Sequence, residues 1–204
     1  EPHPHGLFPA PGGIVYLCDL GVERVLQYAL QADGSLTRTS RTLQLPPGSG
    51  PRHMAFTSDY RFAYVLNELS NTLTACTHDK DTGLAVVDSY STLPPDFTEL
   101  SHTAEVEVHP NNKWVYASNR GHHSLAIFKI NARDGSLSLT SFCALKGSEP
   151  RNFRIAPDGR WVLVANQNSD SIDTYRLDPT TGILAELVST TATGTPVTMD
   201  FLNF

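Results

Sequence analysis

Residues 61–64, RFAY, are one copy of a short pattern that occurs four times in this chain of 204 residues. The other copies are GIVY, KWVY and RWVL, at residues 13–16, 113–116 and 160–163. Their last residues are 48, 52 and 47 positions apart, and two further sets of residues repeat with the same spacings. These sets are Tyr28, Cys76, Phe128 and Tyr175, and Asp19, Asn67, Asn119 and Asn166. Three sets in one register indicate an internal repeat of about 50 residues.

Each repeat contains short apolar stretches rich in Val, Tyr, Phe, Trp and Thr, separated by turns. A glycine recurs in a later turn, where a positive φ angle is easily adopted, at Gly34, Gly83, Gly135 and Gly182. No apolar stripe with a 3.6-residue period is long enough for a helix. Four strands in roughly 40–50 residues are typical of a propeller blade. The sequence therefore predicts an all-β fold, a β-propeller of four-stranded antiparallel blades.

We expect a single propeller across residues 1–204. The expected blades cover about residues 5–49, 51–99, 101–148 and 150–195. Residues 197–204 are left over, and we expect them to form one further strand that closes the ring.

The composition argues against several classes of partner. The formal net charge is −6, so a general affinity for nucleic acid or for an anionic membrane is not expected. No apolar run approaches the roughly 18 residues that span a bilayer, and no signal-peptide pattern opens the chain. Cys18, Cys76 and Cys143 are odd in number and widely spaced, which suits a reducing compartment better than a disulfide framework. We therefore expect a cytoplasmic location.

Arg52 and Glu68 flank the hairpin that contains the RFAY copy. Because the start of one antiparallel strand lies beside the end of the next, both side chains should lie at the same rim of the propeller. The innermost strands line the central channel, so the equivalent positions of all blades should face one shared bowl. The first position holds Arg52, Ala104 and Arg151, and also His5 if one gap is accepted. The second position holds Leu20, Glu68, Arg120 and Gln167.

These rim positions differ from blade to blade and are mostly charged, unlike the Tyr and Asn anchors. Such variation is expected when the repeat supplies a scaffold and single blades supply the chemistry of a site. Arg52, Arg120 and Arg151 around Glu68 would attract an anionic small molecule and still leave a base available. The alternative is that Arg52 and Glu68 form only a solvated ion pair, worth about 0–1 kcal/mol.

Other polar residues allow more than one interpretation. His53 either lines the bowl or is a satisfied histidine of the core or rim. Glu105 lies on an expected inner strand, where an unpaired carboxylate would be costly, so we expect it to meet one of the arginines. His3 and His5 would face the same way on a strand and could chelate a metal, but no third ligand stands at a suitable spacing. We expect no metal and no other cofactor.

Longer segments resemble a known family. These are GPRHMAF, AYVLNELSNTLT, HPNNKWVYASNRGHHSLAIF and PRNFRIAPDGRWVLVANQNSDSIDTY. They are similar to the lactonase family of seven-bladed propellers, which includes the propeller-type 6-phosphogluconolactonases and the fungal 3-carboxy-cis,cis-muconate lactonizing enzyme. The resemblance runs from His5 to Phe204. It implies that the chain holds the C-terminal four blades of seven, with a closing strand.

The resemblance also implies a site. The lactonizing branch uses a His, two Arg and a Glu on one rim, and by motif these match His5, Arg52, Glu68 and Arg120. The first hypothesis is hydrolysis of 6-phosphogluconolactone, or of a similar anionic sugar lactone, in the pentose phosphate pathway. Glu68 would be the general base, and Arg120 with His5 would stabilise the oxyanion. Arg52 and Arg151 would hold the phosphate or carboxylate, with His53, Glu105 and Gln167 as further substrate-binding residues.

Two alternatives stay open. The protein could be a carboxymuconate-type lactonizing cyclase, with an Arg-bound carboxylate in place of the phosphate. It could also be a catalytically silent binding propeller or an inactive fragment. Four blades without closure would expose apolar blade faces, so self-association through the open edges is a further expectation.

Overall fold

The structure is a computed structural model that describes residues 1–202, and its regular secondary structure is almost entirely β-strand. The only helical element in that range is a single 3₁₀ turn, η1 (Gln167–Ser169). Residues 1–202 contain no helix long and apolar enough to cross a lipid bilayer.

The strands form four separate antiparallel sheets of four strands each. The first contains β1 (Pro4–Ala10), β2 (Ile14–Asp19), β3 (Arg24–Leu30) and β4 (Leu36–Gln44). The second contains β5 (Pro51–Phe56), β6 (Phe62–Asn67), β7 (Thr72–Asp79) and β8 (Gly83–Ser91). The third contains β9 (His102–Val108), β10 (Trp114–Arg120), β11 (Ser124–Ile130) and β12 (Leu137–Ala144). The fourth contains β13 (Pro150–Ile155), β14 (Trp161–Asn166), β15 (Ser171–Leu177) and β16 (Leu184–Ala192).

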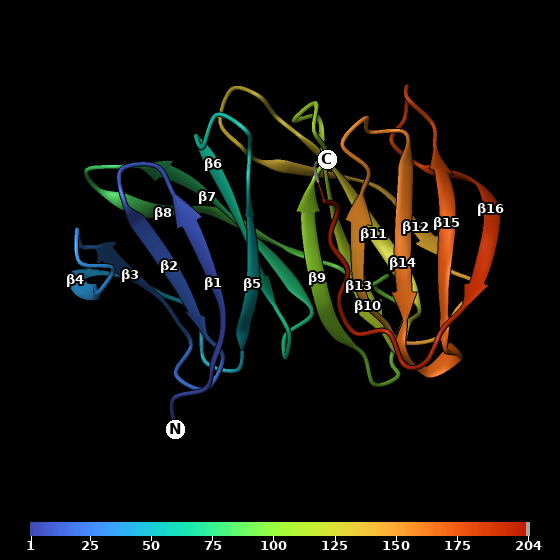
Figure 1. The fold of residues 1–204 in the computed structure, drawn as a ribbon, viewed down its shortest axis with the longest axis horizontal. Coiled ribbons are helices and arrows are strands. Elements are labelled where there is room, and N and C mark those ends of the chain that lie inside the picture. The colour runs from blue at the N-terminus through green and yellow to red at the C-terminus, as the bar shows by residue number, and fades with distance from the viewer. Residues whose placement is uncertain (203–204) are drawn as a thin grey trace.

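The sheets stand in chain order, and the first strand of each lies next to the first strand of the following sheet (Figure 1). The strands β1, β5, β9 and β13 therefore form an inner row, whereas β4, β8, β12 and β16 are outermost. This arrangement confirms the predicted all-β, propeller-like fold.

An apolar cluster fills the space between each pair of successive sheets. The repeated tyrosines also tie neighbouring sheets together. The hydroxyl of Tyr64 donates a hydrogen bond to the carbonyl of Gly135 at 3.2 Å, and that of Tyr116 donates to the carbonyl of Gly182 at 2.7 Å. Two of the anchors in the repeat are therefore partners across a sheet interface.

The inner strands share an irregularity near their first residues. The pairing register shifts between Pro4 and Gly6, between Pro51 and His53, and between Pro150 and Asn152. A comparable shift occurs where β9 pairs with β10. Such bulges bend a strand and redirect a side chain, and here they fall on the predicted rim positions, including His5, Arg52 and Arg151.

The end of the chain differs from the expected closing strand. Residues 197–202 form no strand, and residues 203–204 of that prediction lie outside the described part of the chain. The main chain of Met199 is held by side chains of β13 instead. Its N–H donates to Asn152 Oδ1 at 2.9 Å, and its carbonyl accepts from Arg154 Nε at 3.0 Å. A strand needs a ladder of main-chain partners, which these side-chain contacts do not supply.

Replacing Gly182 by Ala should destabilise the protein more than replacing Gly34, its counterpart in the first sheet. Both glycines have positive φ angles, 73° and 83°, which disfavour alanine by about 1–2 kcal/mol. A Cβ at Gly182 would also lie 2.5 Å from the ring of Trp114, whereas one at Gly34 meets nothing within 4 Å. That overlap should cost about a further 1–3 kcal/mol in the free energy of unfolding, measured in urea. Equal losses in the two variants would contradict the packing of Trp114 against this turn.

Candidate active site

Three of the predicted charged residues meet at one rim of the inner row. Arg52 lies on β5, Glu68 follows β6, and Arg120 ends β10. Arg52 Nη1 is 2.6 Å from Glu68 Oε2, and Arg120 Nη2 is 2.5 Å from Glu68 Oε1. One carboxylate thus joins guanidinium groups from two adjacent sheets.

Both guanidinium groups are also fastened to the backbone of β9. Arg52 Nε donates to the carbonyl of Ala104 at 2.8 Å, and Arg120 Nη2 donates to that of Thr103 at 3.2 Å. The side chains of Arg52, Glu68 and Arg120 are only 6%, 15% and 11% exposed. A solvated ion pair does not fit this burial, because a buried cluster must be held by hydrogen bonds on every side.

The charge state of Glu68 follows from its neighbours. Burial alone would raise its pKa, but Arg52 and Arg120 outweigh that effect and hold the pKa below its usual value. Each of its oxygens already accepts a short, charge-assisted hydrogen bond. This geometry argues against the general-base role predicted for Glu68, since a carboxylate with a lowered pKa accepts a proton less readily.

His5 stands beside this cluster on the bulge of β1. Its pKa is lowered to about 4, first by partial burial and then by the positive charge of Arg52 and by His53, with Arg151 adding to the effect. Its ring centroid is 4.9 Å from that of His53. At neutral pH the structure therefore offers His5 as an uncharged imidazole next to two arginines.

Arg151 and Gln167 pair with each other rather than with Glu68. Arg151 Nη1 donates to Gln167 Oε1 at 3.3 Å. Arg151 lies on the bulge of β13, as His5 and Arg52 lie on the bulges of β1 and β5, and its positive charge adds to the lowering of the pKa of His5. These two predicted residues thus form a separate polar pair at the edge of the cluster.

Glu105 meets an arginine, Arg154, as expected, but its shorter contacts are with other side chains. Its Oε1 lies 2.8 Å from His53 Nδ1, and its Oε2 accepts a short hydrogen bond from the side-chain amide of Asn152. Arg154 Nη1 lies 3.9 Å from Oε2. The nearest side chains are those of the adjacent inner strands β5 and β13, which face Glu105 from both sides.

Sequence reasoning missed a second charged group deeper along the inner strands. Arg154 Nη1 lies 2.9 Å from Glu107 Oε1, and the N–H of Ile155 donates to Glu107 Oε2 at 2.6 Å. Burial raises the pKa of Glu107 to about 7, although that N–H and Arg154 oppose the shift. Polar residues at two-residue spacing, Glu105 with Glu107 and Asn152 with Arg154, were the available signal.

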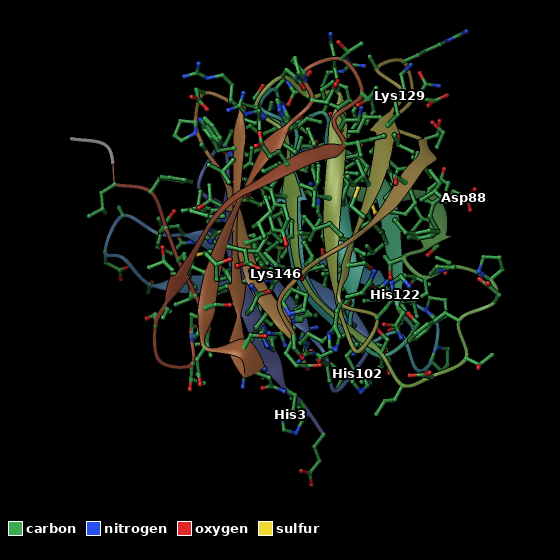
Figure 2. All side chains as sticks on the ribbon, turned by 90° about the vertical axis from the view of Figure 1, so that its right-hand side faces the viewer. His3, Asp88, His102, His122, Lys129 and Lys146 are labelled. Carbon is green, nitrogen blue, oxygen red and sulfur yellow. The ribbon has the colours of Figure 1, made fainter. Side chains whose placement is uncertain are left out.

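The histidines do not form a metal site with other ligands in the part of the chain that the structure describes. No group of three or more His, Cys, Asp or Glu side chains among residues 1–202 could hold a metal ion. Figure 2 shows His3 at the lower end of the molecule, below the sheets, with His102 at the same end. The rim therefore contains guanidinium groups, which can bind an anion or donate hydrogen bonds to an oxyanion, and the uncharged imidazole of His5.

Known proteins similar to this chain include several enzymes of sugar-lactone metabolism. It is 34% identical over 206 residues to a 6-phosphogluconolactonase of Bacillus subtilis (strain 168), a match that covers 100% of this chain and 58% of that protein. It is 31% identical to a 6-phosphogluconolactonase of Yersinia pestis (strain Pestoides F), a match that covers 91% of this chain and 56% of that protein. Among solved structures, the periplasmic gluconolactonase PpgL of Pseudomonas aeruginosa has a TM-score of 0.93 at 30% identity, covering 99% of this chain and 57% of that one.

The chain therefore spans little more than half the length of these relatives. The matched region nonetheless includes all four sheets. Residues 1–201 match the family described as "Lactonase, 7-bladed beta-propeller", and the chain belongs to that family.

Proposed function

We propose that the protein hydrolyses a sugar lactone that carries an anionic group, with 6-phosphogluconolactone as the first candidate. The observation that carries this proposal is the buried cluster of Arg52, Glu68 and Arg120 beside an uncharged His5. Two guanidinium groups share one carboxylate, so a positive charge remains for an anionic substrate or for an oxyanion. Relatives named as 6-phosphogluconolactonases support the choice of substrate.

We also propose that the chain corresponds to the C-terminal four blades of a seven-bladed propeller. Four sheets are present, and the chain covers 58% of the Bacillus subtilis relative in a family described as seven-bladed. On this view the open faces at the ends of the row are covered by further blades or by a second copy. Leu7 of β1, at one end, is 54% exposed.

The rim residues take the following roles in this proposal. Arg120 and His5 would stabilise the oxyanion that forms on the lactone carbonyl by donating hydrogen bonds to it. Arg151, with Gln167 beside it, would bind the phosphate at the edge of the site. Glu68 would hold Arg52 and Arg120 in place rather than accept a proton, because both of its oxygens are occupied.

A carboxymuconate-type cyclase would need the same arginines for a carboxylate, and a silent binding protein would turn over neither substrate. Assays with both substrates separate these alternatives from lactone hydrolysis. A cytoplasmic location remains part of the proposal, and the three cysteines, all free, support it.

Arg151→Gln in the intact protein should reduce the preference for a phosphorylated lactone. We expect kcat/KM for 6-phosphogluconolactone to fall about 10-fold or more, since a charge-assisted hydrogen bond is worth about 1.5–3 kcal/mol. The value for unphosphorylated gluconolactone should change little, and a pH-stat assay corrected for spontaneous hydrolysis measures both. Arg176→Gln is the control, because Arg176 is 55% exposed on β15. Equal losses for the two lactones would contradict the phosphate-binding role.

Glu68→Gln should destabilise the protein at neutral pH and much less in acid. The pKa of Glu68 is lower in the folded protein than in the unfolded chain, where it is about 4.3. Its contribution is therefore complete above that pH and is lost as the pH falls through the folded value. Removing the shared anion of two buried cations should cost roughly 3–5 kcal/mol at pH 7, measured by urea unfolding.

The exposed pair Arg176–Glu186 supplies the control for that experiment. Its atoms are 3.8 Å apart, so Glu186→Gln should cost less than about 1 kcal/mol. The interpretation of Glu68 fails if the loss in Glu68→Gln is the same at pH 7 and at pH 3.

His5 should titrate far below an ordinary histidine. Its ring resonances, followed by NMR against pH, should give a pKa of about 4 because of partial burial and the charge of Arg52. Arg52→Gln should raise that pKa, and Arg151→Gln should raise it less, since the effect of Arg151 is smaller. A midpoint near 6.5 in the unsubstituted protein would show that His5 does not sit among these cations.

A further inference from the structure

His53 and Glu105 form a hydrogen-bonded pair that takes no part in the roles proposed above. His53 Nδ1 lies 2.8 Å from Glu105 Oε1, and the two side chains are 21% and 6% exposed. The pair joins β5 to β9, so it bridges two neighbouring sheets. A buried carboxylate that holds a partly exposed histidine is the arrangement that orients an imidazole for proton transfer.

The other partners of Glu105 determine which nitrogen of His53 carries the proton. The N–H of Met199 donates to Asn152 Oδ1 at 2.9 Å, so the amide nitrogen of Asn152 faces Glu105 and donates to Oε2. The N–H of Val106 donates to Oε1 at 3.1 Å. Both oxygens of Glu105 thus accept from N–H groups. A carboxylate has no proton to donate, so His53 donates from Nδ1, and in the neutral ring Nε2 then keeps its lone pair.

The ring that carries this lone pair lies near His5, at the edge of the cationic cluster. The ring of His53 is 4.9 Å from the ring of His5 and 5.8 Å from that of Phe8, measured between centroids. Its neighbour in the chain is Arg52, which binds Glu68. Within residues 1–202, no protein hydrogen bond reaches His53 Nε2. A water or substrate atom at the rim can therefore reach it.

We propose that His53 accepts the proton of the attacking water and that Glu105 is the residue that positions it; this inference rests on the proposed lactone hydrolysis. Nε2 takes a proton as the water oxygen bonds to the lactone carbonyl carbon. The bond between that carbon and the ring oxygen then breaks, and the ring oxygen leaves with the proton from Nε2. The net change is the addition of one water molecule, and no other reactant is needed.

Glu105→Gln tests the pair directly, because it should invert the tautomer of His53. Asn152 still presents its amide nitrogen, since Met199 holds the other end. The substituted side chain then turns its amide oxygen toward Asn152 and Arg154 and its NH₂ group toward His53 Nδ1, which becomes the acceptor, while the N–H of Val106 loses its partner. NMR of the ring nitrogens in ¹⁵N-labelled protein should show the Nδ1–H form in the unsubstituted protein and the Nε2–H form in the variant.

The same spectra contain an internal reference. His109 Nδ1 accepts from the N–H of Asn111 at 3.2 Å, and its Nε2 lies 2.9 Å from the carbonyl of Gly159. His109 should therefore be in the Nε2–H form in both proteins. Glu105→Asp, which keeps the carboxylate, should leave His53 in the Nδ1–H form. An Nε2–H form of His53 in the unsubstituted protein would overturn the pair.

Kinetics of the intact protein test the role in catalysis. Glu105→Gln should lower kcat for the lactone by about 10²–10⁴-fold with little change in KM, because the base is lost while binding remains. Glu105→Asp should restore much of the rate. If Glu105→Gln inverts the tautomer and still has full kcat, His53 is not the proton acceptor, whereas the proposed lactone hydrolysis stands. An unsubstituted protein that hydrolyses no lactone would overturn the proposed function as well, whatever the tautomer.

Discussion

Where the second sheet packs against the third, and the third against the fourth, the outer turn of the later sheet must admit an aromatic side chain of the sheet before it. Gly135 and Gly182 meet this requirement against Phe62 and Trp114, with positive φ angles that alanine would resist. The tyrosine hydroxyls then reach the carbonyls of the same glycines. Everything at the rim depends on this packing, because it brings the inner strands side by side.

The bulges of the inner strands convert this scaffold into a site. In an even ladder, Arg52 and His53 would point to opposite faces of the sheet. The register shift between Pro51 and His53 changes that alternation, so that Arg52 reaches the backbone of β9 while His53 meets Glu105 on the same strand. The extra residue therefore lets the consecutive side chains of Arg52 and His53 both lie at the same rim. Bulges redirect side chains in this way near functional sites in other sheets.

Much of the fold and part of the site could be predicted from the sequence. The spacing of Tyr64 and Tyr116 predicted repeated sheets, and antiparallel pairing placed Arg52 beside Glu68. The hydrogen bonds of Glu105 could not be predicted, because they depend on which strand of another sheet faces it and on how the amide of Asn152 is turned. Residues 197–202 lie outside any strand, and alternating apolar residues do not reveal whether a main-chain partner is available.

The two carboxylates at the rim illustrate why residue type alone does not assign a role. Glu68 lies between two guanidinium groups that stabilise its negative charge, so proton uptake would weaken the cluster that it holds together. Glu105 accepts hydrogen bonds from two neutral N–H groups, lies 3.9 Å from Arg154 and is paired with His53, so its carboxylate is placed to orient the imidazole ring. A general base takes up a proton during the reaction, so the resulting change in its charge must cost little free energy. In the reaction that we propose, His53 is therefore the proton acceptor, and Glu68, whose two oxygens are held by Arg52 and Arg120, belongs to the binding surface.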